Sequence, residues 1–328
     1  MATLTHISNL HHSLPQARLA ELLCTHSFAD KVFFCNSGAE ANEAAIKLAR
    51  KFGGDKREGR YEILTTLGSF HGRTLATISA TGQEKVRQGF APLLEGFRYV
   101  PYDDLEATEA AVSDRTIAIL VEPIQGEGGV NVPHPGYLKD LRALCDRHGL
   151  LLILDEIQVG MGRTGNLFAY EHTGITPDII TLAKALGGGV PIGAMLARGE
   201  VAESFNLGSH GSTFGGNAIA CAAGIAVVNT LLHGGVLENC RVMGEYFLGR
   251  LRALQGKFPF IKNVRGAGLI LGAELDREGG PITDACLQEG LLINCTVGKV
   301  LRFLPPLIVT KAEIDEGLAI LEQVLERQ

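Results

Sequence analysis

The sequence of 328 residues predicts an α/β fold, with a mostly parallel central sheet flanked by helices. Short apolar runs alternate with amphipathic stretches along the first two thirds of the chain. Hydrophobic residues make up 46% of the sequence, and the 41 glycines cluster in short loops, as expected for tight turns. Beyond about Leu232 the pattern changes, which indicates a second, smaller domain.

The larger, N-terminal part contains the apolar strands and most of the clear helices. Parallel strands that are buried on both faces have continuous apolar runs. The predicted strands are Val32–Asn36, Glu62–Thr66, Thr116–Val121, Leu150–Leu154, Ile179–Leu182 and Ile192–Ala197. The predicted helices are Ala39–Phe52, Pro135–His148 and Asn217–Leu232. Ligands of such sheets bind at the carboxyl ends of strands, so the residues that follow these runs are candidate site residues.

The last third of the chain has the pattern of a small α+β domain. Its predicted elements are helices at Val236–Leu254 and Lys311–Arg327 and strands at Gly268–Leu275, Leu291–Asn294 and Val300–Leu304. We therefore expect a large domain over residues 1–231 and a small C-terminal domain over residues 232–328.

Composition and charge argue against several classes of partner. The chain has 30 Lys and Arg against 36 Asp and Glu, without the clustered cations that phosphate backbones require, so we expect no nucleic-acid partner. No apolar run is long enough to span a membrane, and Met1 to His12 lack the regions of a signal peptide. The seven cysteines are scattered, with no C-x-x-C pair, as in reduced cytosolic proteins. The sequence predicts a cytoplasmic protein without a membrane partner or a metal site.

The segment Asn36–Glu43 follows a predicted strand and opens a predicted helix. Free N–H groups and the positive end of the helix dipole make such a helix start an anion site, and Gly38 lets the backbone approach a phosphate. An ordinary capped helix is the alternative, with Ser37 as N-cap and Glu40 in the first turn. Taken alone, the segment favours neither interpretation.

Asp155 stands at the end of the apolar run Leu150–Leu154. A buried carboxylate is costly unless a partner compensates its charge. A protonated pyridine nitrogen would keep Asp155 ionised, and Asp155 would keep the ring cationic and electron-withdrawing. A metal-binding or Walker-B-like aspartate is the alternative, but the sequence has no Gly-x-x-x-x-Gly-Lys-Ser/Thr motif.

Lys184 lies just after the predicted strand Ile179–Leu182 and precedes a run of glycines. Apolar surroundings depress the pKa of a lysine, which favours Schiff-base chemistry. A surface lysine whose stem covers apolar groups is the alternative. Because Lys184 follows Asp155 by 29 residues, one strand–helix unit later, we interpret the two as parts of one site.

Six motifs follow one another in an order that is typical of one enzyme family. They are NSGAEANEAAIKLAR, SFHGRT, EPIQGEGG, DEIQVGMGRTG, LAKALGGGVPIGA and GSTFGGN. Over essentially the whole chain, the sequence resembles the class III aminotransferases of pyridoxal-phosphate (PLP) fold type I. The stretch Thr5–Leu10 and the Glu-Ala-Asn-Glu form of the first motif are most similar to members that act on acetylornithine. A full-length member would carry an additional N-terminal segment, whereas here the family pattern starts almost at Met1.

The resemblance implies which residues hold PLP. Lys184 would attach the cofactor covalently, Asp155 would pair with its ring nitrogen, and Phe70 would stack on its ring. The other implied cofactor-binding residues are Ser37, Gly38 and Ala39 in the phosphate loop, Glu156, Ile157 and Gln158 after Asp155, with Gln158 at the 3-oxygen, and Thr213. Thr213 would reach the phosphate in the neighbouring subunit, which implies a homodimer with active sites at the subunit interface.

The resemblance also implies how substrates are held. Arg73 would bind the carboxylate of acetylornithine, with Ser212 close to the substrate. Arg302 is similar to the arginine that binds the α-carboxylate of glutamate and 2-oxoglutarate. Glu127 is similar to the glutamate that masks this arginine while an ω-amino substrate reacts. Alternatively, Arg302 is the outward residue of a strand and Glu127 a solvated loop acid.

The implied reaction is transamination of N2-acetylornithine with 2-oxoglutarate, which gives N-acetylglutamate 5-semialdehyde and glutamate in arginine biosynthesis. Succinylornithine, succinyldiaminopimelate, ornithine and 4-aminobutyrate are alternative donors. An inactive PLP-binding remnant is a further alternative. A nicotinamide-dependent dehydrogenase is less compatible with the sequence, because no Gly-x-Gly-x-x-Gly follows the first predicted strand.

Overall fold

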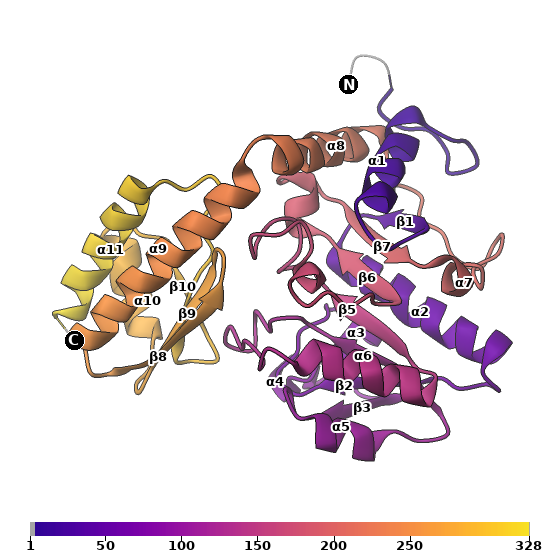
Figure 1. Ribbon diagram of the computed structural model, residues 1–328, viewed down its shortest axis with the longest axis horizontal. Helices are drawn as coiled ribbons and strands as arrows, with labels where there is room; N and C mark the ends of the chain where they lie inside the picture. The colour runs from indigo at the N-terminus through magenta and orange to yellow at the C-terminus, as the bar shows by residue number, and fades with distance from the viewer. Residues whose placement is uncertain (1–3, 328) are drawn as a thin grey trace.

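The computed structural model describes residues 4–327 and contains two sheets, which lie on opposite sides of Figure 1. The strand order is β1-β7-β6-β5-β4-β2-β3 in the larger sheet and β10-β11-β9-β8 in the smaller one. The first two thirds of the chain form the larger sheet, and the last third forms the smaller one. The predicted architecture, a central sheet flanked by helices with a smaller C-terminal sheet domain, is confirmed.

The larger sheet is mixed, with a parallel centre. Its strands are β1 (Lys31–Cys35), β2 (Glu62–Thr66), β3 (Phe97–Val100), β4 (Thr116–Val121), β5 (Leu151–Asp155), β6 (Ile179–Leu182) and β7 (Gly193–Ala197). Strands β3, β2, β4, β5 and β6 pair in parallel, whereas β7 pairs antiparallel with both β6 and β1. The six predicted strands match these bounds or differ by one residue, and β3 is an additional strand at the sheet edge.

Helices cover both faces of the larger sheet. On β5, Leu152 and Leu154 pack into the core that includes side chains of α1, α6 and α8, while Leu151 and Ile153 pack into the core beneath α2. Because both faces are buried, β5 is apolar at every position from Leu151 to Leu154. The helices of this part are α1 (Leu14–Thr25), α2 (Gly38–Lys56), α3 (Leu75–Ala80), α4 (Glu84–Arg87), α5 (Leu105–Ala111), α6 (Tyr137–His148), η1 (Ala169–His172), η2 (Lys184–Gly187), α7 (Gly199–Ala202) and α8 (Ala218–His233).

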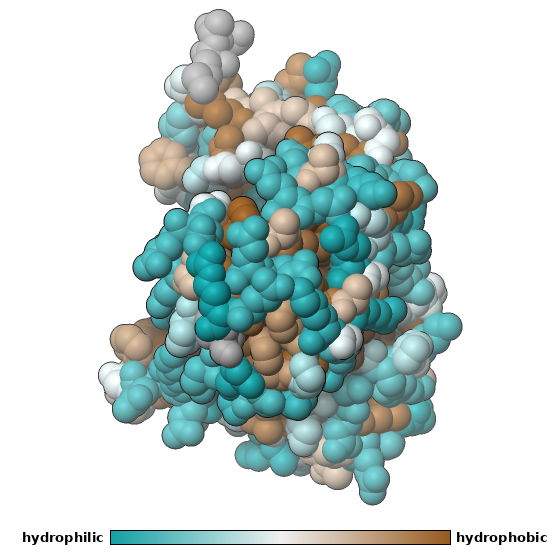
Figure 2. All heavy atoms as spheres, turned by 90° about the vertical axis from the view of Figure 1, so that its left-hand side faces the viewer, coloured by the Kyte–Doolittle hydropathy of each residue, from teal (hydrophilic) through white to brown (hydrophobic). Residues whose placement is uncertain are grey.

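The smaller sheet is antiparallel throughout. Its strands are β8 (Ile261–Ala267), β9 (Ile270–Leu275), β10 (Asn294–Thr296) and β11 (Val300–Phe303), and its helices are α9 (Val236–Lys257), α10 (Gly280–Gln288) and α11 (Lys311–Leu325). Side chains of α9, α10 and α11 pack with the sheet in a second core. Figure 2 shows the outer face of this part, where hydrophilic residues dominate and hydrophobic side chains appear in the gaps between them.

The strand predicted at Leu291–Asn294 is wrong in position. Leu291 and Ile293 pack against the second core without pairing, and the ladder begins at Asn294, opposite Arg302. The apolar run reflects packing of a loop, which periodicity cannot distinguish from a short strand.

Within residues 4–327, no single helix is both long and apolar enough to cross a membrane. Helices α8 and α9 meet those criteria only when taken together, and a bend of 67° separates them.

The topology brings several strand ends to one edge of the larger sheet. Strands β2, β4, β5 and β6 run in parallel, and β1 has the same direction because two antiparallel pairings separate it from β6. The loops after these strands therefore meet at one edge, where ligands of such sheets bind.

Candidate active site

A cavity of about 470 Å³ opens at this edge of the larger sheet. Loops that follow β1, β2, β4, β5 and β6 form its wall. The predicted site residues that line it are Ser37, Gly38, Ala39, Phe70, Arg73, Glu127, Asp155, Ile157, Gln158 and Lys184. Residues that are far apart in the sequence thus line the same cavity.

Helix α2 begins at the cavity. Ser37 is its N-cap and accepts a hydrogen bond from the Glu40 N–H at 3.2 Å. The carboxylate of Glu40 in turn accepts from the backbone N–H of Asn36 at 2.8 Å, so the cap is closed from both sides. The N–H groups of Gly38 and Ala39 have no acceptor within the helix, because they lie in its first turn. The helix is both ordinarily capped and able to bind an anion.

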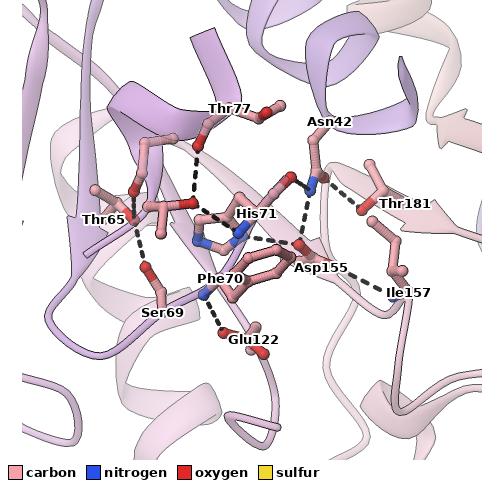
Figure 3. A network of polar contacts seen from close by, with 12 residues as sticks. Asn42, Thr65, Ser69, Phe70, His71, Thr77, Glu122, Asp155, Ile157 and Thr181 are labelled. Carbon is pink, nitrogen blue, oxygen red and sulfur yellow. Dashed lines mark hydrogen bonds and ion pairs between the residues drawn. The ribbon is translucent and has the colours of Figure 1, made fainter. Parts of the chain in front are cut away.

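Asp155 lies at the end of β5 and is only 3% exposed. Its Oδ2 accepts from Asn42 Nδ2 at 2.8 Å and lies 2.8 Å from His71 Nδ1 (Figure 3). Its Oδ1 accepts from the backbone N–H of Ile157 at 3.1 Å. Three neighbours therefore satisfy a buried carboxylate that also faces the cavity.

Lys184 follows β6 directly and lines the cavity. Its φ of +41° lies in the left-handed region, which a residue with a Cβ adopts only at a cost of about 1–3 kcal/mol. Burial lowers the pKa of its amine, and the carboxylates of Asp155 and Glu127 oppose this effect. A lysine with a lowered pKa is a better nucleophile towards carbonyl carbons.

Glu127 and Arg302 form an ion pair that joins the two parts of the chain. Arg302 Nη1 donates to Glu127 Oε1 at 2.8 Å and to Gln158 Oε1 at 3.1 Å, and its Nε donates to Asn294 Oδ1 at 3.2 Å. Burial opposes ionisation of Glu127, but the hydrogen bond and charge of Arg302 outweigh it and lower the pKa of Glu127. Arg302 is 7% exposed, so it is not an outward strand residue, and Glu127 is not a free loop acid.

Arg73 differs from Arg302 in its surroundings. It is exposed, lines the cavity, and its guanidinium carbon lies 5.5 Å from the centre of the Phe70 ring. Phe70 holds its place through its backbone N–H, which donates to Glu122 Oε1 at 2.9 Å.

Four predicted residues lie off the cavity wall: Arg302, which contacts Glu127 and Gln158 of the wall, and also Glu156, Ser212 and Thr213. The carboxylate of Glu156 accepts from the N–H groups of Ala169 and Tyr170 at 2.6 and 2.8 Å. Ser212 Oγ accepts from Asn36 Nδ2 at 3.2 Å, and Thr213 is exposed. Ser212 also accepts from the Gly215 N–H at 3.0 Å and, through its carbonyl, from Asn9 Nδ2 at 3.1 Å, and Glu156 supports the loop that contains η1.

The sequence-based selection missed three residues of the site, namely Asn42, His71 and Glu122. Asn42 and His71 contact Asp155 directly. Burial raises the pKa of Glu122 to about 7, with a further rise from the charge of Asp155 and an opposing effect of His71. Asn42 could have been recognised in the sequence as a polar residue on an apolar helix face. His71 and Glu122 could have been recognised as members of the quoted motifs.

Comparisons with known proteins agree with this chemistry. The family model "Aminotransferase class-III" matches residues 1–325. The chain belongs to the class III aminotransferases. The acetylornithine aminotransferase of Caldanaerobacter subterraneus is 54% identical, over 98% of this chain and 82% of its own length. That of Methanocaldococcus jannaschii is 51% identical, over 98% of this chain and 81% of its own length.

Solved structures of other aminotransferases have the same fold. The ornithine aminotransferase of Toxoplasma gondii aligns with a TM-score of 0.95 and 36% identity, over 99% of this chain and 80% of that chain. The N-acetylornithine aminotransferase of Stenotrophomonas maltophilia aligns with a TM-score of 0.85 and 40% identity, over 99% of this chain and 83% of that chain. The predicted PLP-dependent transferase fold is confirmed.

The cofactor of this aminotransferase is pyridoxal 5′-phosphate, and the cavity fits it. PLP presents a phosphate, a pyridine nitrogen and an aldehyde. The cavity offers a helix start at Gly38, a buried carboxylate at Asp155 and an amine at Lys184. A Cβ on Gly38 would lie 2.9 Å from side-chain atoms of Ile157, so the glycine keeps this helix start open.

Proposed function

We propose that this aminotransferase converts N2-acetylornithine and 2-oxoglutarate into N-acetylglutamate 5-semialdehyde and glutamate, a step of arginine biosynthesis. The observation that carries the proposal is the different accessibility of two arginines: Arg73 lines the cavity, and Arg302 contacts its wall through Glu127 and Gln158. Arg73 is free at the cavity, whereas Arg302 is paired with Glu127. The relatives named as acetylornithine aminotransferases support the choice of donor.

In the proposed reaction the residues of the cavity bind and orient the reactants. Gly38 and Ala39 bind the phosphate through backbone N–H groups, and Phe70 lies against the cofactor ring. Asp155 pairs with the ring nitrogen, and Gln158 contacts the ring oxygen. When bound, PLP withdraws electrons from the substrate carbon that carries the amino group.

Lys184 acts as anchor and as acid–base group. Lys184 would hold the cofactor in the resting enzyme and, as a free amine, would take up the proton that leaves the donor's δ-carbon. Burial lowers the pKa of its amine and so favours the unprotonated form that a general base requires. Asp155 takes no part in this proton transfer, because its oxygens already accept hydrogen bonds. Its role is to compensate the charge of the ring nitrogen.

Glu127 and Arg302 separate the two half-reactions. While the pair is closed, Arg302 is neutralised, and acetylornithine is held through its carboxylate at Arg73. A dicarboxylate offers Arg302 a bidentate partner in place of Glu127, which then moves aside. The same cavity can therefore receive two substrates of different length.

We propose further that the enzyme is a cytoplasmic homodimer. Thr213 is exposed in a single chain, as expected if it reaches the phosphate bound by a second chain. All seven cysteines are free thiols, which is typical of a reducing compartment.

Borohydride reduction tests the central assignment. Reduced holoenzyme should carry the cofactor on the peptide that contains Lys184, and a Lys184→Ala variant should carry none. Attachment to another lysine would refute the assignment. Single-turnover absorbance measurements with acetylornithine, succinylornithine, ornithine and 4-aminobutyrate then identify the donor, and a faster half-reaction with any other amine would replace acetylornithine.

A further inference from the structure

Asn42 has a hydrogen-bonding pattern that permits only one orientation of its amide. Its Oδ1 accepts from the Thr181 hydroxyl at 2.8 Å, and its Nδ2 donates to the His71 carbonyl and to Asp155 Oδ2, both at 2.8 Å (Figure 3). A flipped amide would place its oxygen against two acceptors. Asn42 is fully buried, so no water competes for these contacts.

His71 is held at both ends of its backbone. Its N–H donates to Thr81 Oγ1 at 3.0 Å, and its carbonyl accepts from Asn42. Its side chain is completely buried, with Nδ1 2.8 Å from Asp155 Oδ2. The ring can therefore neither rotate freely nor exchange Asp155 for solvent.

The two ring nitrogens of His71 have different surroundings. Since Asp155 Oδ2 is an acceptor, Nδ1 carries the hydrogen of this contact. Nε2 is buried and has no hydrogen-bond partner among residues 4–327. Nδ1 is therefore the ring nitrogen through which His71 holds Asp155.

We infer that His71 is a positioning residue, which together with Asn42 orients the Asp155 carboxylate towards the cofactor ring. The inference rests on the proposed pairing of Asp155 with the ring nitrogen. Two buried donors on Oδ2 fix the carboxylate, as outer partners fix metal ligands.

Two substitutions separate donation from space filling. His71→Asn places an amide N–H near the former Nδ1 but removes most of the ring, whereas His71→Leu keeps the volume and removes the donor. With acetylornithine as the amino donor, we expect His71→Leu to lower kcat of the first half-reaction about ten- to a hundredfold, with KM nearly unchanged. His71→Asn should stay within about threefold of the wild type.

Cofactor retention provides a readout that is independent of turnover. After dialysis, His71→Leu should lose PLP faster than the wild type, and His71→Asn should retain it, as measured by absorbance of the protein-bound cofactor. A ring that merely fills space predicts the reverse order. That reversal, or equal impairment of both variants, overturns the inference.

Three further variants distinguish a failure of this inference from general destabilisation and from a failure of the proposed role of Asp155. Thr108→Val removes one buried hydrogen bond on α5, from its hydroxyl to the Asp104 carbonyl at 2.7 Å, and should behave like the wild type. If His71→Leu does not fold, Asn42→Leu removes the second donor and should show the same loss of kcat; a wild-type kcat refutes the inference. A fully active Asp155→Asn would instead refute the proposed role of Asp155, whatever the His71 variants do.

Discussion

Arg73, which lines the cavity, and Arg302, which contacts Glu127 and Gln158 of its wall, have opposite local environments. Arg302 is buried and has three side-chain partners on Glu127, Gln158 and Asn294. Arg73 is exposed, and its nearest aromatic neighbour is Phe70. A carboxylate must therefore displace an ion pair to reach Arg302, but only water to reach Arg73.

Lysine substitutions at these positions should affect different half-reactions. A lysine cannot reproduce the planar fork that binds a carboxylate bidentately. Arg302→Lys should mainly slow the half-reaction with glutamate or 2-oxoglutarate, and Arg73→Lys should mainly slow the half-reaction with acetylornithine. In each case the activation free energy should rise by about 1–3 kcal/mol. Glu127→Ala should speed the reaction with glutamate by unmasking Arg302. Single-turnover absorbance reports each half-reaction, and equal slowing of both by either arginine variant would contradict the division of roles.

Most charged residues of the site were predictable from the sequence, although Glu122, directly after β4, was missed. Asp155 and Lys184 were predicted because a charge at the end of an apolar strand needs a reason. Asn42 and His71 do not stand out in the sequence in this way, because polar side chains also occur at caps and turns. Their roles depend on a contact between α2, β5 and the loop after β2, which only the tertiary structure shows.

At the scale of elements, helix α2 combines two tasks of the site. Its N-terminus at Gly38 lines the cavity, and Asn42, four residues later, lies on the same face and holds Asp155. One rigid helix thus sets the distance between the phosphate position and the ring partner. Its buried face, which includes Ala45, Leu48 and Phe52, fixes the helix to the sheet.

Two glycines of α2 make a matched pair for testing this arrangement. In Gly38→Ala, the new Cβ would lie 2.9 Å from Ile157 Cδ1 and Cγ2 and push that side chain towards the cofactor. PLP affinity should fall about tenfold, as expected for overpacking of about 1–3 kcal/mol. Gly54→Ala meets no atom within 4 Å and should raise stability by about 0.5–1 kcal/mol, with unchanged affinity. PLP titration and thermal unfolding measure both; unchanged affinity in Gly38→Ala would be the contrary result.

The strands that sequence patterns missed lie at the edge of the larger sheet and in the smaller sheet. Strand β3 is a short edge strand with the sequence Phe-Arg-Tyr-Val, and only its last residue is buried. Strand β8 has exposed residues at Lys262 and Asn263, so it lacks the apolar run that predicts a central strand. Burial on both faces makes a strand recognisable, and these strands lack it.

For the molecule as a whole, Glu122 should make stability depend on pH. Burial raises its pKa from 4.5 to about 7, so between these values the folded state holds a proton that the unfolded state has released. Stability that depends on Glu122 must therefore fall as the pH rises through this window, by at most about 3 kcal/mol. Denaturant unfolding of the apoprotein should show this decline in the wild type relative to Glu122→Gln, and a constant difference would contradict it.

Complementation between subunits tests the proposed dimer. In a mixed dimer of Lys184→Ala and Thr213→Ala chains, Thr213 acting across the interface leaves one site intact and concentrates both defects in the other. Activity should reappear on mixing, up to about a quarter of the wild-type value after random exchange. Native mass spectrometry verifies the exchange. Strictly additive loss in verified mixed dimers would place Thr213 in its own subunit's site.

The pairing of β1 with β7 has a consequence for synthesis of the chain on the ribosome. Strand β1 is made first, but among residues 4–327 it pairs only with β7, with Lys31 opposite Ala197. At roughly 5–20 residues per second, the nascent chain carries Val32, Phe33 and Phe34 without their ladder for about ten seconds or more. An unpaired apolar strand attracts other strands. The early part of this chain is therefore where we expect chaperones to bind during translation.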